Sequence, residues 1–171
     1  MNQTTWTCAD FESLCWHDNH VHGFMIREGD YGAGQLILDL DYILEWRCGV
    51  DKICSFMLAP ADLVFDEVTN LLIGIDFRGI SMGPLSIGEI RRETIEHTEQ
   101  FRQYRWTIAF NFPNGEITFL APGFFLELRA SPMERPHQSL TWEERQRLPA
   151  AGQTIRPDDR SLSAPARRST F

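Results

Sequence analysis

The stretch "GQLILDLDYILEW", residues 34–46, decides the fold class of this chain. From residue 36 on, its even-numbered positions are apolar: Leu36, Leu38, Leu40, Tyr42, Leu44 and Trp46. The positions between them form a mixed set: Gln35, Ile37, Asp39, Asp41, Ile43 and Glu45. Because successive side chains of a strand point to opposite faces, this alternation predicts a long antiparallel strand with one apolar and one mixed face. A helix would scatter the apolar positions around its circumference.

The segments around this strand continue the period-two pattern. Residues 20–28 are its predicted hairpin partner, and the glycine-rich residues 29–34 are the predicted loop, since glycine tolerates positive φ angles. Residues 106–121 are a second predicted hairpin, with Asn114 and Gly115 as central turn residues that both take positive φ. Other short apolar runs, each a predicted strand, lie at residues 52–60, 62–68, 70–77 and 123–130.

Three other segments are not simple strands. Residues 10–16 are predicted to form one or two helical turns capped by Asp10. Residues 89–105 have a helix-forming composition, yet their apolar stripe is thin and their first half equally fits an exposed strand. We expect a strand over 85–95 and a loop beyond it. A short helix is predicted over 139–148, where Thr141 and Glu144 have the spacing of a capping box.

Short strands with turn signals every eight to twelve residues predict one mainly β domain. We expect an antiparallel β-sandwich or a partly open barrel with one or two short helices. The tail of the chain is rich in Pro, Ser, Ala and Arg, a composition typical of disorder. The predicted organisation is a flexible lead-in at 1–9, the antiparallel β domain at 10–132, a short C-terminal helix region at 133–150 and a disordered tail at 151–171.

The chain of 171 residues is acidic, with a formal net charge of −8. Residues 151–171 hold four arginines against two aspartates, a charge of +2, which leaves −10 on residues 1–150. An acidic surface repels phosphate backbones and argues against nucleic-acid binding. No apolar run approaches the roughly 20 residues of a membrane helix, and the first residues lack the features of a secretory signal. We therefore expect a cytoplasmic protein that binds neither nucleic acid nor membranes.

The four cysteines are Cys8, Cys15, Cys48 and Cys54. Their spacing matches no zinc framework, because no C-x-x-C pair is present. In a reducing compartment, we expect them to be small buried hydrophobic residues.

The sharpest candidate for a functional site is "WHDNHVHG", residues 16–23. In a strand that begins near residue 19, His20 and His22 project from the same face, about 6.6 Å apart. Two aspartates of the neighbouring strand are natural partners for them across the hairpin. Nitrogen and carboxylate ligands suit zinc or ferrous iron. The candidate metal ligands are therefore His17, His20, His22, Asp39 and Asp41.

A structural role for the same residues is the stronger interpretation. A sheet with one wet face places histidine opposite aspartate as an ordinary cross-strand pair. The sequence does not fix the register, and a slip of one residue would put the groups on opposite faces.

Four stretches, "WHDNHVHG", "LILDLDYILEW", "APADLVFDEV" and "GEITFLAPGFFLELR", together resemble a family of small uncharacterised bacterial proteins. Those proteins have a Trp-His-Asp start followed by a long LDLDYILEW-type strand. The resemblance covers about residues 16–130 and implies a stand-alone, β-rich bacterial domain. It carries over no activity, cofactor or catalytic residue. In size and acidity, the chain also resembles, more distantly, immunity-type proteins that neutralise a toxin by binding it.

Two hypotheses about function follow. The first and favoured one is a non-catalytic binding or interaction module without a cofactor, whose partner is a basic protein or a second copy of the chain. The second is a metal-dependent hydrolase or ligand-binding protein, in which a divalent metal such as zinc activates water.

Overall fold

The computed structural model describes residues 3–29, 31, 34–50, 53–78, 85–97 and 102–152. Within these residues the chain forms nine strands, one 3-10 helix (η1) and one turn of α-helix, which confirms the predicted mainly antiparallel β fold with short helices. The elements are β1 (Thr5–Thr7), η1 (Cys8–Ser13), β2 (His20–Glu28), β3 (Gly34–Cys48), β4 (Cys54–Ile75), β5 (Leu85–His97), β6 (Arg102–Phe112), β7 (Gly115–Ala121), β8 (Phe125–Leu128), β9 (Met133–Arg135) and α1 (Trp142–Arg145).

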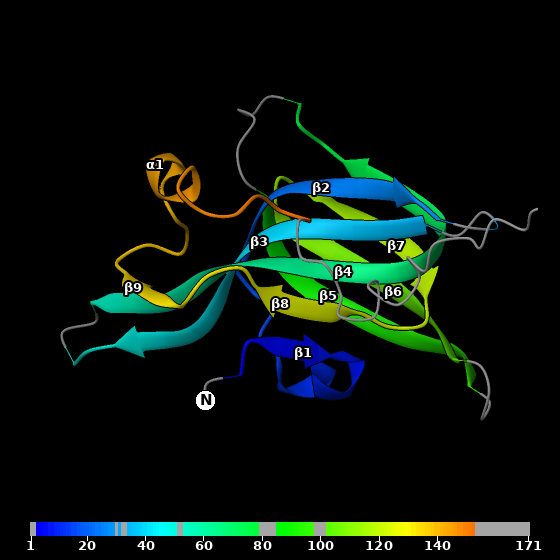
Figure 1. The fold of residues 1–171 in the computed structure, drawn as a ribbon, viewed down its shortest axis with the longest axis horizontal. Helices are drawn as coiled ribbons and strands as arrows, with labels where there is room; N and C mark the ends of the chain where they lie inside the picture. The colour runs from blue at the N-terminus through cyan, green and yellow to red at the C-terminus, as the bar shows by residue number, and fades with distance from the viewer. Residues whose placement is uncertain are drawn as a thin grey trace, which may run out of the picture.

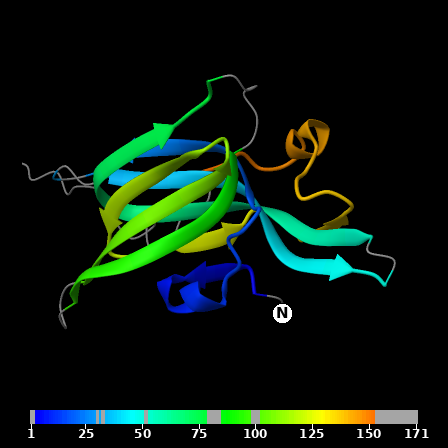
Figure 2. The same ribbon diagram turned by 180° about the vertical axis from the view of Figure 1, so that it is seen from behind.

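All strands belong to a single sheet that folds back on itself. The pairing order is β1-β8-β4-β3-β2-β5-β6-β7, β9 pairs with β4, and β4 also pairs with β7. As a result, β2, β3 and β4 form one layer and β5, β6 and β7 form the other (Figures 1 and 2). β2 and β5 pair only between His20 and Ser86 and between Val21 and Leu85. The main core lies between the two layers.

The predicted strand at 34–46 is confirmed as β3, and its apolar face points into this core. Leu36, Leu38 and Leu40 are fully buried there. The core is rich in aromatic rings; for example, Phe65 lies 5.2 Å from Trp106 between ring centroids, with their planes tilted at 62°. Edge-to-face contacts of this kind add to the free energy gained by burying the rings.

β4 is one strand of 22 residues where the sequence predicted three separate runs. Pro60 does not interrupt it. The Pro60 carbonyl accepts a hydrogen bond from the Arg129 amide at 2.8 Å, at the edge where β8 has ended and β9 has not begun. The nitrogen and carbonyl of a strand residue point to the same edge, so the missing N–H of proline falls in this gap between partner strands.

β4 turns at a corner that lies near the predicted break between the runs 62–68 and 70–77. Glu67 and Asn70 have φ angles of 51° and 52°. The pairing register of β4 with β3 shifts across Glu67, and its register with β7 shifts across Asn70. Bulges with a left-handed residue bend a strand strongly, and beyond the bend β4 pairs with β7 in the second layer.

The chain after β8 covers the outer face of β3 and β4. We call residues 133–152 the strap. It begins as β9 beside β4, forms α1 and then runs on across the first layer (Figure 1). The predicted capping box is confirmed: the Thr141 hydroxyl accepts from the Glu144 amide, and the Glu144 carboxylate accepts from the Thr141 amide. Leu140 completes a second, small core with Ile43, Phe56 and Leu58.

Several local predictions are wrong. The expected lead-in contains β1, which pairs with β8. The N-cap of η1 is Thr7, and Asp10, at the third position of the helix, is the other member of its capping box. The strand at 85–95 is confirmed, but β6 begins at Arg102, inside the expected loop, because its alternating residues face the core. The predicted strand at 123–130 is present as the shorter β8, which pairs with β4 and β1.

The turn at residues 112–115 also differs from its predicted form. The hairpin is present, but neither Asn114 nor Gly115 has a positive φ, and the Phe112–Pro113 peptide bond is cis. Turns with a cis proline are a separate class from the tight hairpin turn that the Asn-Gly pair suggested. Most of the predicted tail, from residue 153 on, and residues 30, 32 and 33 of the predicted loop lie outside the described residues.

The prediction of four small buried cysteines is wrong as well. Cys48 and Cys54 lie directly opposite each other on β3 and β4 and form a disulfide. Cys8 is half-buried and Cys15 is exposed. No helix in the described part of the chain is long and apolar enough to cross a membrane.

Candidate functional site

The corner formed by residues 16–19 fixes where the histidines lie. The Asn19 side chain is fully buried, and its amide nitrogen donates to the backbone carbonyls of Cys15 at 2.9 Å and of Trp16 at 2.7 Å. Its side-chain oxygen accepts from the Ile43 amide of β3 at 2.7 Å. Asp18 has a φ of 63°, which Asn and Asp tolerate better than most residues, and its amide donates to the Ile87 carbonyl of β5 at 2.8 Å. The corner is thereby tied to both neighbouring strands.

The three histidines of this segment have different environments. His17 is exposed, and its Nδ1 lies 3.0 Å from the Asp18 carboxylate. Nδ1 of His20 is buried and makes no hydrogen bond to any described residue. Burial and the neighbouring His22 lower the pKa of His20, while Asp41 and Asp18 oppose this shift. Nε2 of His22 lies 2.8 Å from Oδ2 of Asp41.

Asp41 is the centre of the site and is fully buried beneath the strap. Its Oδ2 contacts His22 and also accepts from the Leu140 amide at 2.8 Å, and its Oδ1 binds the Arg145 guanidinium. Burial alone would raise the pKa of Asp41. The contact with His22, the charge of Arg145 and the Leu140 amide outweigh burial and lower the pKa below its ordinary value of 3.8. Asp41 is therefore charged at neutral pH.

Two more aspartates extend this arrangement over β3 and β4. Asp39 binds the guanidinium groups of both Arg145 and Arg129. Nε of Arg129 forms an ion pair with Oδ1 of the fully buried Asp62 at 3.2 Å, and the Gly152 amide donates to Oδ2 of Asp62 at 2.7 Å. We call these groups the Asp–Arg cluster: His22, Asp39, Asp41, Asp62, Arg129 and Arg145.

The cluster joins three carboxylates to two guanidinium groups, so its carboxylates outnumber its guanidinium groups by one. Burial raises the pKa of the nearby Glu127, and the charge of Asp62 adds to this shift. Hydrogen bonds between guanidinium and carboxylate groups are strong and directional. Because the aspartates belong to the sheet, whereas Arg145 and two of the donating amides belong to the strap, the chemical effect of the cluster is to attach the strap.

The structure brings together only part of the predicted metal site. His22 and Asp41 are in contact, and His20 lies beside them. Asp39 instead faces two guanidinium groups, and His17 pairs with Asp18. Among the described residues, no group of three or more His, Cys, Asp or Glu side chains could hold a metal ion.

The functional residues that the sequence reasoning missed are Asn19, Asp62, Arg129 and Arg145. The two arginines form hydrogen bonds with aspartates 90 to 106 positions earlier in the chain, so no local spacing signals them.

Residues 79–83, "GISMG", match the G-x-S-x-G pattern of a nucleophilic serine. That pattern requires a strand–turn–helix context; here the next described element is strand β5, and the motif itself lies outside the described residues.

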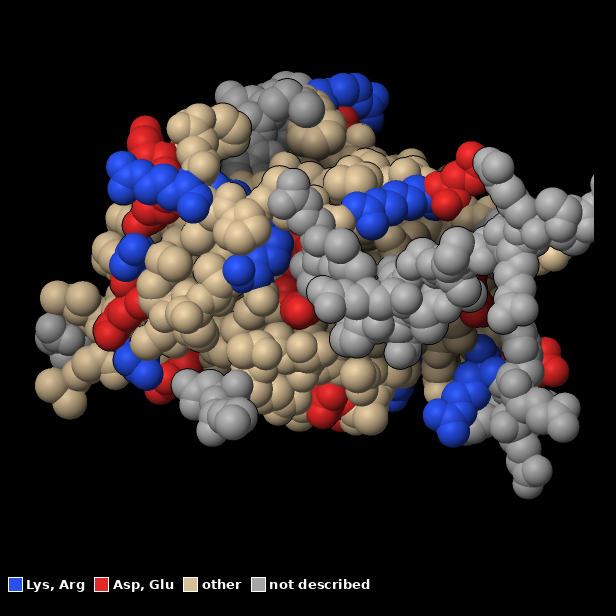
Figure 3. Space-filling view, viewed as in Figure 1, with Lys and Arg blue, Asp and Glu red and all other residues tan. Residues whose placement is uncertain are grey.

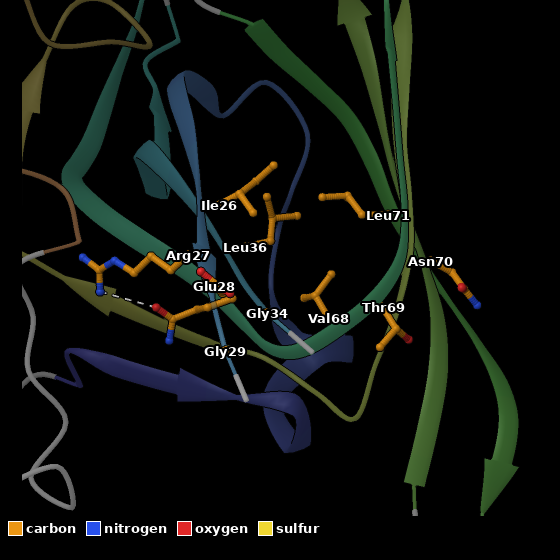
Figure 4. A pocket seen from close by; sticks show the side chains of 11 residues that line it. Ile26, Arg27, Glu28, Gly29, Gly34, Leu36, Val68, Thr69, Asn70 and Leu71 are labelled. Carbon is orange, nitrogen blue, oxygen red and sulfur yellow. Dashed lines mark hydrogen bonds between the residues drawn. The ribbon is translucent and has the colours of Figure 1, made fainter. Parts of the chain in front are cut away.

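The described part of the surface also contains hollows, one away from the cluster and one that includes Arg129 in its lining. A pocket of about 330 Å³ opens at the corner of β4, where Ile26, Leu36, Val68 and Leu71 form its apolar wall (Figure 4). Arg27 lies at its rim and donates to the Gln35 side chain at 3.4 Å (Figure 4). A wider groove of about 1040 Å³ runs between β1, the outer part of β3 and the connection after β8.

No family model matches this chain, and no curated protein or solved structure matches it either. The resemblance to a bacterial family therefore stays a prediction. The function has to be argued from the geometry of the chain itself.

Proposed function

We propose that this protein is a non-catalytic binding module that binds a basic protein partner. The observation that supports this most is an arm that extends from the main body of the fold. The arm consists of residues 45–50 and 53–57, the outer parts of β3 and β4, and it projects beyond the two layers of the sheet (Figures 1 and 2).

The arm exposes apolar side chains close together. Trp46 is partly exposed and packs edge-on against Phe56, with ring centroids 5.0 Å apart. Val50 is fully exposed, and the exposed fraction of Ile53 is 73%. The Cys48–Cys54 disulfide joins the two strands beside them. Exposed apolar residues that cluster on one element are typical of an interaction surface, whereas isolated ones are common on any protein.

Charge favours a basic partner. The −10 charge of residues 1–150 attracts positively charged proteins and accelerates their association. Figure 3 shows acidic and basic groups intermingled over α1 and β9, where Glu134, Arg135 and Glu144 form ion pairs. We infer that the net negative charge attracts the partner to the molecule and that the arm supplies the apolar contact.

The test is capture of a cross-linked partner in the source cells, quantified by mass spectrometry. We expect a protein with a net positive charge to be recovered in a stoichiometric amount with the unmodified chain. The double variant Trp46→Ser/Ile53→Ser should lose it. The control Leu72→Ser removes a side chain that is 66% exposed but lies outside the arm, and it should retain the partner. Recovery of no such protein, or equal recovery with the arm variant, would contradict the proposal.

A cytoplasmic location stays part of this proposal. The Cys48–Cys54 disulfide bears on it, because disulfides persist mainly in oxidising compartments. Alkylation of the protein in intact source cells, before any oxidation in the extract, measures the free thiols. Four free thiols are expected for a reducing cytoplasm, and two would place the protein in an oxidising compartment.

The contacts of the Asp–Arg cluster do not favour a metal-dependent hydrolase. Guanidinium groups and backbone amides contact the carboxylate oxygens that the metal would need. Metal analysis of protein purified without a histidine tag tests this choice. Stoichiometric zinc, iron or manganese that disappears in the variant His20→Ala/His22→Ala would restore the enzyme hypothesis.

A further inference from the structure

The strap is attached to the sheet in a different way from every long strand. Only Met133–Arg135 pairs with a strand, in register with Leu58–Phe56 of β4. Between residues 139 and 152, each hydrogen bond that holds the strap to the rest of the described protein has a side chain as donor or acceptor. The Leu140 amide and Arg145 bind Asp41, the Gly152 amide binds Asp62, and the Pro149 carbonyl accepts from Arg129 at 2.6 Å.

The apolar contact beneath the strap is also small. Four buried residues form the second core; the strap contributes Leu140 to it, and the partly buried Met133 and Leu148 of the strap pack against it. The main core contains most of the other buried apolar side chains, including every fully buried aromatic ring. Segments with few apolar contacts and little regular backbone pairing open locally at a lower free energy than the core strands.

Arg145 is the residue that links the strap to the aspartates most directly. Its guanidinium binds Asp39 and Asp41 together, and its side chain is only 11% exposed. Without it, Asp41 would lose its guanidinium contact and keep His22 and the Leu140 amide, while Asp39 would keep Arg129. Removing one partner of a buried ion pair leaves the remaining charge without compensation and is strongly destabilising.

We propose that the strap opens and closes as one unit over the outer face of β3 and β4, and that Arg145 is the latch that keeps it closed. This inference is independent of the proposed function. Opening uncovers Ile43 and Leu58 beside Asp39, Asp41 and Asp62, an apolar and acidic surface that the closed strap hides. The strap thereby controls access to this face of the sheet.

The surface suggests what it would bind once uncovered, a step that does rest on the proposed function. In the closed state, the strap covers this surface with the buried Leu140 and the partly buried Met133 and Leu148. It adds one guanidinium, that of Arg145, five residues after Leu140. A basic partner with an apolar residue and an arginine at similar spacing has the chemistry to replace it.

The experiment is hydrogen exchange of the full-length protein, followed by mass spectrometry. We compare Arg145→Gln with a matched control, Arg105→Gln, whose guanidinium pairs with Glu93 at 2.8 Å on the exposed side of β5 and β6. Arg145→Gln should accelerate exchange across residues 139–152 by roughly 10- to 100-fold and leave β6 and β7 unchanged. The control should change neither region. Unchanged exchange in the strap, or an equal increase in β6 and β7, would overturn the proposal.

A second measurement covers the case in which Arg145→Gln fails to fold. In the unmodified protein, exchange is followed at increasing low concentrations of guanidinium chloride. The Leu140 and Gly152 amides should open at a lower free energy than amides of β6 and β7. If strap and core amides have the same opening free energy at every concentration of denaturant, the strap unfolds only with the whole domain. That result would contradict the proposal.

Discussion

The two faces of β3 are built on different principles. On the inner face, Leu36, Leu38 and Leu40 are buried between the two layers of one sheet. On the outer face, Asp39 and Asp41 are covered by the strap and compensated by two arginines. The apolar face excludes water by its composition, whereas the acidic face is buried only because other segments supply the matching charges.

Because of this difference, burial of the two faces contributes to stability in different ways. Burial of aliphatic side chains is favourable by about 25 cal/mol per Å² and needs no specific partner. Burial of a carboxylate costs several kcal/mol before its partners compensate for the lost hydration. We therefore expect substitutions on the inner face to lower the stability of the whole domain. Substitutions on the outer face should first loosen the strap.

The largest effect is expected from Leu38→Ala on the inner face. Truncating a fully buried leucine leaves a cavity and lowers the free energy of unfolding by about 2 to 5 kcal/mol. Urea unfolding followed by far-UV circular dichroism measures the change. The exposed Leu72→Ala serves as a control with a change of less than about 0.5 kcal/mol. Equal effects of the two substitutions would show that the inner face is not the core.

Acid should act on the outer face first. The pKa of Asp41 is lowered in the folded protein, so its ionised form adds stability that is complete above the ordinary pKa of 3.8 and is lost as the pH falls below it. Glu127 acts in the opposite direction, because its pKa is raised. Limited proteolysis by pepsin between pH 4.5 and 2.5 should cut residues 139–152 before the core strands. Cleavage that begins within β6 or β7 would contradict this order.

The smallest effect is expected where the same kind of ion pair is exposed. Arg105 pairs with Glu93 at 2.8 Å, and both side chains are more than half exposed. Exposed ion pairs of this kind contribute less than about 1 kcal/mol. Arg105→Gln should therefore leave the urea midpoint almost unchanged, and raising the salt concentration should remove any remaining difference. A loss of stability as large as that caused by Leu38→Ala would contradict the expectation that an exposed ion pair contributes little.

The inner face could be predicted from the sequence because period-two alternation determines the direction of each side chain. The capping box of Thr141 and Glu144 was also predictable, since both residues lie within one turn. The contact of His22 with Asp41 follows the predicted pairing of histidines with aspartates across the hairpin, although a bulge between Val21 and Gly23 places His22 there.

The outer face could not be predicted, because its partners come from distant parts of the chain. Nothing near Arg129 or Arg145 in the sequence indicates that their guanidinium groups lie over Asp39 and Asp41. The continuity of β4 through Pro60 depends on a gap between β8 and β9, which is also a property of the tertiary structure. Local patterns predict the direction in which a side chain points, and they do not predict what covers it.

A double-mutant cycle between Asp41 and Arg145 tests most directly whether the acidic face is buried beneath the strap. The free energies of unfolding of Asp41→Asn, Arg145→Gln and the double variant are measured against the unmodified protein. For a buried pair, we expect a coupling free energy of about 1.5 to 3 kcal/mol. A coupling within about 0.5 kcal/mol of zero, as for an exposed pair, would contradict the account.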